Sequence, residues 1–168
     1  MTIVQELARV FAPWQSLYSD TKAVSIAVPA LHIVAMLIGG GMAVAADRMT
    51  LRMAGRREGE REWHLDELAA VHRPVLVALT VMFLTGIALF AADVKTYAVS
   101  PVFWIKLGLV TLLMLNGIVL ARTEAKLRRV SVDASGTAAL WKRMQRTSIA
   151  SLTLWTTTAL AGAVLVGM

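Results

Sequence analysis

The stretch from Ala23 to Ala46, AVSIAVPALHIVAMLIGGGMAVAA, contains no Asp, Glu, Lys or Arg, and its one ionisable side chain is His32. A bilayer has a hydrocarbon core about 30 Å thick, which about 20 apolar residues cross as a helix. The stretch is therefore predicted to span a membrane. An ionisable group at bilayer depth is costly and marks a functional position by default, so His32 is the first candidate site residue.

Further apolar runs predict an all-α fold, a bundle of four transmembrane helices in a single integral-membrane domain over residues 1–168. Hydrophobic residues make up 57% of the chain and charged residues 17%, a composition too apolar for an ordinary soluble domain. The predicted spans are 23–46, 74–92, 102–121 and 147–168. The connections 47–73 and 122–146 are expected to be long and polar, with helical character again from about Trp63, and 93–101 is expected to be a short turn.

Residues 1–20 are predicted to form an amphipathic helix on the membrane surface. Ile3, Leu7, Phe11 and Trp14 follow one another at steps of three or four residues, so they share one helical face. Pro13 and the polar residues after it are expected to end this helix before the first span.

The basic residues predict the orientation. The net charge of +6 could suggest a nucleic-acid partner, but Lys and Arg are concentrated in the connections 47–73 and 122–146, as the positive-inside rule requires. We therefore expect the bilayer as the partner and no nucleic acid. Both termini are placed on the non-cytoplasmic side of a multi-pass protein of the bacterial inner (plasma) membrane.

The residues that are missing exclude several kinds of chemistry. There is no cysteine, so disulfides, thiolate metal sites and covalent haem attachment are excluded. The sequence has no Walker loop, dinucleotide fingerprint, nucleophile motif or zinc-protease helix, and it indicates no enzyme class. Because the four predicted spans contain no Asp or Glu, a carboxylate proton relay or cation-coupled transport is disfavoured.

One helical face carries a candidate metal or cofactor site. Met36 follows His32 by one turn and Gly39 by two, so an imidazole, a thioether and a gap lie on the same side. The glycines 39–41 would let another backbone, or a porphyrin, come close. The alternative is structural: His32 hydrogen-bonds a Ser or Thr of a neighbouring helix, such as Thr85 or Thr156, and the glycines serve helix packing.

Helix depth selects among possible partners of His32. His72 is expected to lie about 20 Å deeper, because a helix rises about 1.5 Å per residue, whereas Met82 lies at a similar depth. A His–Met pair suits a haem iron or a copper ion. His64 and His72 are expected in a solvated salt-bridge network. Its other expected members are Asp47, Asp66, Glu67 and Arg73, and Asn116 is expected to make a hydrogen bond between helices.

Two resemblances add to these expectations. HRPVLVALTVMFLTGIALF resembles the span of membrane cytochrome b subunits that has His-Arg and then Thr-Gly, which implies that His72 ligates haem, with Gly86 on almost the same face. LHIVAMLIGGGMAVAADRMTLR, TGIALF and SPVFWIKLGLVTLLMLNGIV are similar to small bacterial four-helix integral-membrane families, distantly like the membrane domain of copper-resistance protein D. That second resemblance implies that His32 is the first-helix histidine of the group and Lys106 the lysine that opens its third helix.

Two hypotheses follow for function. In the first, the protein is a cytochrome b-like subunit that binds haem b or copper through His32 and transfers electrons within a larger membrane system. In the second, it is an accessory or structural subunit without a cofactor. Both hypotheses predict contacts with other membrane subunits or with further copies of the chain.

Overall fold

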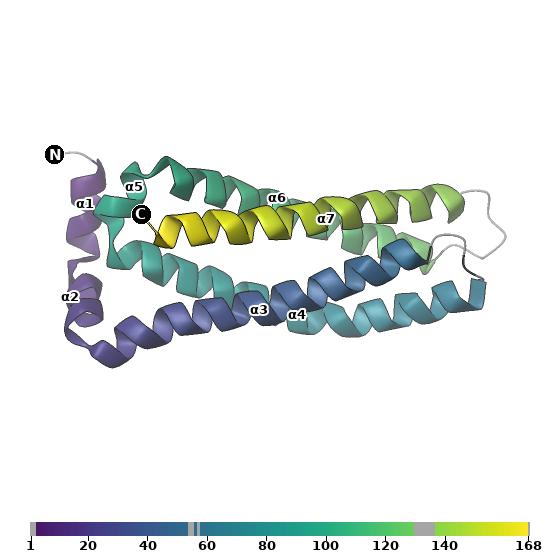
Figure 1. Cartoon of the computed structure of the whole chain (residues 1–168), viewed down its shortest axis with the longest axis horizontal. Coiled ribbons are helices and arrows are strands. Elements are labelled where there is room, and N and C mark those ends of the chain that lie inside the picture. Colours follow the sequence, from purple (N-terminus) through teal and green to yellow (C-terminus); the bar gives the residue numbers. More distant parts are fainter. Residues whose placement is uncertain (1–2, 54–55, 57, 130–136, 168) are drawn as a thin grey trace.

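In the computed structural model, which describes residues 3–53, 56, 58–129 and 137–167, the regular structure is helical throughout (Figure 1). The helices are α1 (Ile3–Val10), α2 (Ala12–Asp20), α3 (Lys22–Arg52), α4 (Glu58–Ala92), α5 (Val94–Val99), α6 (Pro101–Leu127) and α7 (Thr137–Val166).

Four of these helices, α3, α4, α6 and α7, are long and apolar enough to cross a membrane. The chain is therefore a multi-pass membrane protein by the length and composition of its helices. With 31 residues, α3 is about 46 Å long, which exceeds the hydrocarbon thickness of about 30 Å. The long helices therefore extend beyond the apolar layer.

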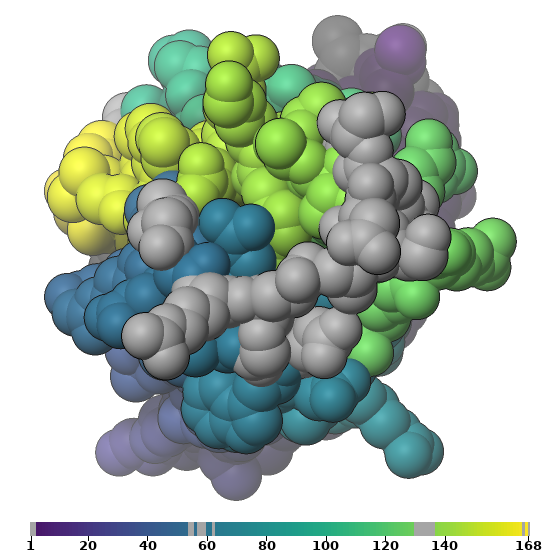
Figure 2. All heavy atoms as spheres, turned by 90° about the vertical axis from the view of Figure 1, so that its right-hand side faces the viewer, coloured from purple at the N-terminus to yellow at the C-terminus, as the bar shows by residue number. Residues whose placement is uncertain are grey.

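The four long helices pack as two hairpins. Helix α3 packs on α4, α6 packs on α7, and the hairpins meet where α3 lies against α7 (Figure 1). The two termini lie at one end of the bundle, called here the terminal end, and the ends of α3 and α6 and the beginnings of α4 and α7 lie at the other, called the connection end. Viewed from the connection end, the blue ends of α3 and α4 and the green ends of α6 and α7 form one face, with the purple N-terminal segment behind them (Figure 2).

Helices α1 and α2 lie across the terminal end, at a steep angle to the bundle (Figure 1). The predicted amphipathic segment is therefore two helices that join at Phe11, and Pro13 lies in the first turn of α2 and does not end it. Proline fits there because the first N–H groups of a helix have no partner within the helix. Trp14 Nε1 donates to the Ala88 carbonyl at 2.8 Å and Gln15 Nε2 to that of Ala91 at 3.2 Å, which attaches α2 to the end of α4.

The proline inside α3 explains a second contact of α2. Pro29 has no N–H, so the carbonyl of Ser25, four residues earlier, lacks its helical donor. The Tyr18 hydroxyl donates to that carbonyl at 3.4 Å. The aromatic side chain thus satisfies a main-chain group that the proline leaves free.

Two apolar clusters form the core. The cluster nearer the middle of the bundle comprises Ala35, Met82, Leu113 and Trp155, one residue from each long helix. The cluster at the connection end comprises Leu65, Leu68, Leu127, Trp141 and Met144. Each cluster includes residues from both hairpins, so burial of these side chains holds the hairpins together.

The long polar connections expected from the sequence are largely helical. Helix α3 continues to Arg52 and α4 begins at Glu58, so few residues remain between the two helices. Helix α6 continues to Leu127 and α7 begins at Thr137, and the turn after residue 93 contains α5. The helix expected from about Trp63 is present in α4, which begins a few residues earlier, at Glu58. The connections are otherwise shorter than expected, because hydropathy detects the apolar part of a helix and misses its charged extensions.

Candidate functional site

His32 of α3 is held by a threonine of α4. Its Nδ1 lies 2.9 Å from Thr85 Oγ1, which confirms the expected hydrogen bond to a neighbouring helix. The Thr85 hydroxyl donates to the Val81 carbonyl at 2.7 Å, so we infer that His32 Nδ1 carries the ring proton and donates to Thr85. The carbonyl of Met82 also faces the His32 ring. In this tautomer Nε2 keeps a lone pair, and no hydrogen bond to Nε2 is found within the described part of the chain.

Several of the predicted site residues gather around His32. A Cβ atom on Gly86 would lie 3.5 Å from His32 Cε1, so the imidazole lies directly against the backbone of α4. Met82 is buried in the middle cluster, and Met36 packs against that cluster. The structure therefore brings His32, Met36, Met82 and Gly86 into one region where α3 packs on α4.

The expected gap at the glycines is filled by other parts of the chain. A Cβ atom on Gly39 would lie 2.8 Å from Ala78 Cβ, and one on Gly40 would lie 3.1 Å from the Trp155 ring. The glycines were expected either to admit a porphyrin or to let helices pack closely. The structure shows close helix packing, with α4 at Gly39 and with α7 at Gly40. Gly41 has no such neighbour within 4 Å.

Gly39 is closely packed whereas Gly41 faces open space, and this difference gives a prediction. Gly39→Ala should lower the free energy of unfolding by about 1–3 kcal/mol, because the added methyl group forces α3 and α4 apart. Gly41→Ala is the matched control, and it should be neutral or should stabilise the helix by up to about 1 kcal/mol. Thermal unfolding of the two variants in detergent measures the difference, and equal melting temperatures would contradict the packing at Gly39.

Lys106 of α6 brings a positive charge into the same half of the bundle. A Cβ atom on Gly162 of α7 would lie 3.1 Å from Lys106 Nζ, so the ammonium group lies against the backbone of α7. Lys106 is near enough to His32 to act on it electrostatically. Among the residues described, no carboxylate forms an ion pair with Lys106. The ammonium group is thus suited to meet a negative group of a ligand.

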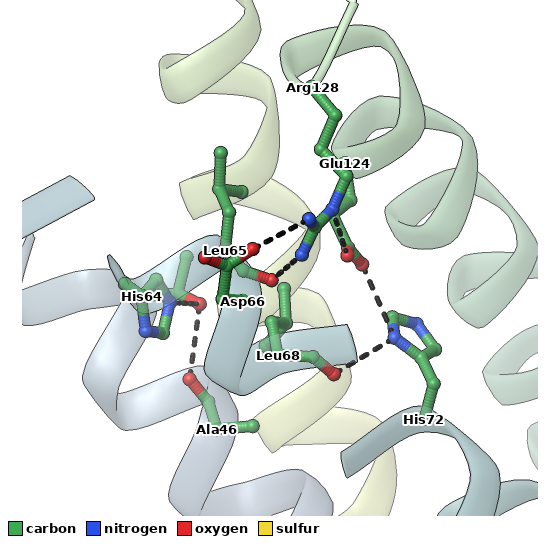
Figure 3. Close-up of polar contacts among 9 residues, drawn as sticks. Ala46, His64, Leu65, Asp66, Leu68, His72, Glu124 and Arg128 are labelled. Atoms are coloured by element: carbon green, nitrogen blue, oxygen red, sulfur yellow. Dashed lines mark hydrogen bonds and ion pairs between the residues drawn. The ribbon is translucent and has the colours of Figure 1, made fainter. Parts of the chain in front are cut away.

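A second group of polar side chains lies toward the connection end and centres on Glu124 of α6 (Figure 3). Glu124 is 5% exposed. Its Oε1 accepts from Arg128 Nε at 3.1 Å, and its Oε2 lies 3.3 Å from His72 Nδ1. His72 Nδ1 also lies 3.1 Å from the Leu68 carbonyl, so this nitrogen carries a proton and donates to both oxygens. Glu124 therefore ties α4 to α6.

Arg128 makes the second link between these helices. Its guanidinium donates to Asp66 at 2.9 Å and to the Leu65 carbonyl, both on α4 (Figure 3). Burial lowers the pKa of Arg128, but hydrogen bonds and charges from Asp66 and Glu124 outweigh burial and raise it. Arg128 consequently remains a cation that joins the ends of the two hairpins.

The expected solvated network is wrong in two respects. Asp47 is 2% exposed and His64 is 1% exposed, because both lie in helices that continue past the predicted span ends. His64 Nε2 bonds Thr50 Oγ1 at 2.8 Å, and its Nδ1 is buried without a partner. Of the other expected members, Glu67 and Arg73 are exposed.

Sequence reasoning missed the two central members of the network, Glu124 and Arg128. The signal available for them was their spacing of four residues, which brings an acid and a base together on one helical face. Asn116, by contrast, was predicted correctly, since its Nδ2 donates to the Thr147 carbonyl of α7 at 2.9 Å.

The structure separates the two histidines that sequence patterns suggested as ligands. His72 bonds groups toward the connection end, whereas His32 bonds Thr85, thirteen residues further along α4 and about 20 Å away along its axis. His32 and His72 do not meet at one ion. In the described part of the chain, no three His, Asp or Glu residues lie together as a metal-binding group.

Fold and contacts define a helical multi-pass membrane protein with two polar centres, one at His32 and one at Glu124. Comparison of the chain with protein-family models, with curated proteins and with solved structures finds no match.

Proposed function

We propose that this protein is an electron-transfer subunit of a membrane system and that His32 binds its redox cofactor, a b-type haem or a copper ion. The observation that carries the proposal is the hydrogen bond from His32 Nδ1 to Thr85, which leaves Nε2 free within the bundle. Histidines that bind metals commonly donate their other ring N–H to such a partner, which sets the tautomer and the ring orientation.

The surrounding residues fit this role in part. Met82 and Met36 pack together in the middle cluster, close to the contact between His32 and α4, and a His–Met pair suits haem iron or copper. Lys106 would attract an anionic group of the cofactor. Gly39 does not offer space for a porphyrin, because Ala78 occupies that side. When bound, the cofactor would supply one-electron transfer, while the chain orients His32 and excludes water.

The test is to measure the haem and copper content of the purified protein. A reduced-minus-oxidised visible spectrum would show haem b, and elemental analysis would show copper. The proposal expects about one haem or one copper per chain. Absence of both in protein produced with haem and copper supplied would overturn the proposal.

A cofactor-free accessory subunit is the second candidate. It is favoured by Gly39 and Gly40, whose close contacts serve helix packing, and by many large apolar side chains exposed along the long helices. Those side chains suit contact with lipid or with the helices of other membrane subunits.

We further propose the orientation, with the terminal end outside and the connection end in the bacterial cytoplasm. The connection end bears most of the Lys and Arg residues, as the positive-inside rule requires. Single cysteines at Ser19 and Thr96 should react with an impermeant thiol reagent added to whole cells. Cysteines at Ala125 and Ala139 should react only after lysis, and their labelling in intact cells would reverse the orientation.

A further inference from the structure

A buried carboxylate lies where the two hairpins meet. Asp47 of α3 faces the hydroxyls of Ser148 and Ser151 of α7, and all three side chains are buried. Two turns along the same contact, Gly40 meets Trp155. The three oxygen-bearing side chains thus belong to the packed α3–α7 contact.

The two serine hydroxyls point toward the Asp47 carboxylate, but the hydrogen bonding at Ser148 is incomplete. Ser148 is 0% exposed, and its hydroxyl oxygen has no hydrogen-bond partner within normal geometry. No Lys, Arg or His of the described residues lies within ion-pair distance of Asp47. A buried carboxylate without a counter-charge is unfavourable, and buried hydroxyls are normally paired. A group that supplies positive charge and accepts oxygen ligands would satisfy both.

We propose that Asp47, Ser148 and Ser151 bind a sodium ion between α3 and α7. Carboxylate and hydroxyl oxygens are hard ligands, which suit a hard cation and do not favour copper or other soft metals. The single carboxylate balances one positive charge, whereas a divalent ion would leave a net charge inside the bundle. Water would complete the coordination shell.

The sequence disfavours cation-coupled transport because the four predicted spans contain no Asp or Glu, and the proposal concerns a bound cation rather than transport. Asp47 directly follows the first predicted span, 23–46, but it lies within α3, which continues to Arg52. The position of the site between α3 and α7 also means that a bound ion would affect the stability of the bundle. Because α3 and α7 belong to different hairpins, a sodium ion that bridges them would stabilise their packing.

Thermal unfolding of the full chain in detergent tests the proposal. Protein prepared in choline chloride is titrated with NaCl, KCl or choline chloride at constant ionic strength, and tryptophan fluorescence is followed on heating. The melting temperature should rise by about 3–6 °C as NaCl approaches saturation, because a ligand that binds only the folded state stabilises it. KCl and choline chloride should leave the melting temperature unchanged.

Two variants and a control localise the effect. Ser148→Ala and Asp47→Asn should each abolish the sodium-dependent rise, and the second keeps the test valid if the first unfolds. Thr153→Val, at an exposed position on α7, should retain the rise. A wild-type melting temperature equal in all three salts would overturn the proposal, as would a rise that persists in both site variants. Asp47 would then be a protonated acid or a hydrated carboxylate.

Discussion

His32→Gln should reduce the haem or copper content of the purified protein to background while the helices still insert and fold. Glutamine can keep a hydrogen bond to Thr85, but its amide cannot replace the imidazole Nε2 as a ligand. The loss of one hydrogen bond between membrane helices lowers stability by only about 0.6 kcal/mol on average, so the melting temperature of the cofactor-free protein should hardly change. Absorption spectra, metal analysis and thermal unfolding of wild type and variant measure both effects.

A substitution at the other candidate histidine shows whether the loss of cofactor is specific to His32. His72→Gln is the matched control, because His72 bonds Glu124 and Leu68 far from His32, and its cofactor content should equal that of wild type. Loss of the haem band in His72→Gln would instead place the cofactor at the position that the cytochrome b resemblance implies.

Thr85→Val tests how His32 is oriented. Valine has nearly the shape of threonine but cannot accept a hydrogen bond, so the His32 ring loses the partner that holds it at 2.9 Å. Loss of such a supporting partner typically weakens metal affinity about 10–100-fold. An unchanged affinity would show that Thr85 has no part in binding.

Glu124→Ala should lower the free energy of unfolding by about 2–3 kcal/mol, a decrease of about 5–10 °C in melting temperature. The carboxylate is buried and accepts from both Arg128 and His72, so its removal leaves two donors without their acceptor. Arg128 is 34% exposed, so its charge can reach water, which keeps the loss below that of a fully buried ion pair.

Asp66→Asn provides the control for Glu124→Ala on the same network. Asp66 also pairs with Arg128, but its side chain is 77% exposed, and exposed ion pairs contribute only about 0–1 kcal/mol. Thermal unfolding in detergent compares the two variants directly. If Asp66→Asn were as destabilising as Glu124→Ala, the link between α4 and α6 would depend on the exposed pair.

The number and order of the long helices could be predicted from the sequence because each apolar run is a local signal. The helix ends could not. Residues such as Asp47 and His64 are polar, and sequence placed them in solvent, but α3 and α4 continue beyond the apolar layer and bury them against other helices.

The candidate site could likewise be predicted only in part, where the signal is local to one helix. His32 stood out as a lone ionisable group in an apolar run. Its depth selected Met82 as a neighbour, and Thr85 was one of two threonines expected as its hydrogen-bond partner. The contacts Asp47–Ser148 and Glu124–His72 join residues from different hairpins. They depend on which helices pack together and in what register, and neither follows from the spacing of residues along one helix.

The order of the helices around the bundle also governs when each contact can form during synthesis. Helices α3 and α4 are neighbours in the chain, as are α6 and α7, so each hairpin can assemble within the bilayer soon after its second helix enters. Helix α3, however, meets its partner α7 only after every other long helix has been made. The surface of α3 that carries Gly40 and Asp47 therefore stays uncovered until α7 has been made, and a chain that ends before α7 would leave both residues without their packing partners.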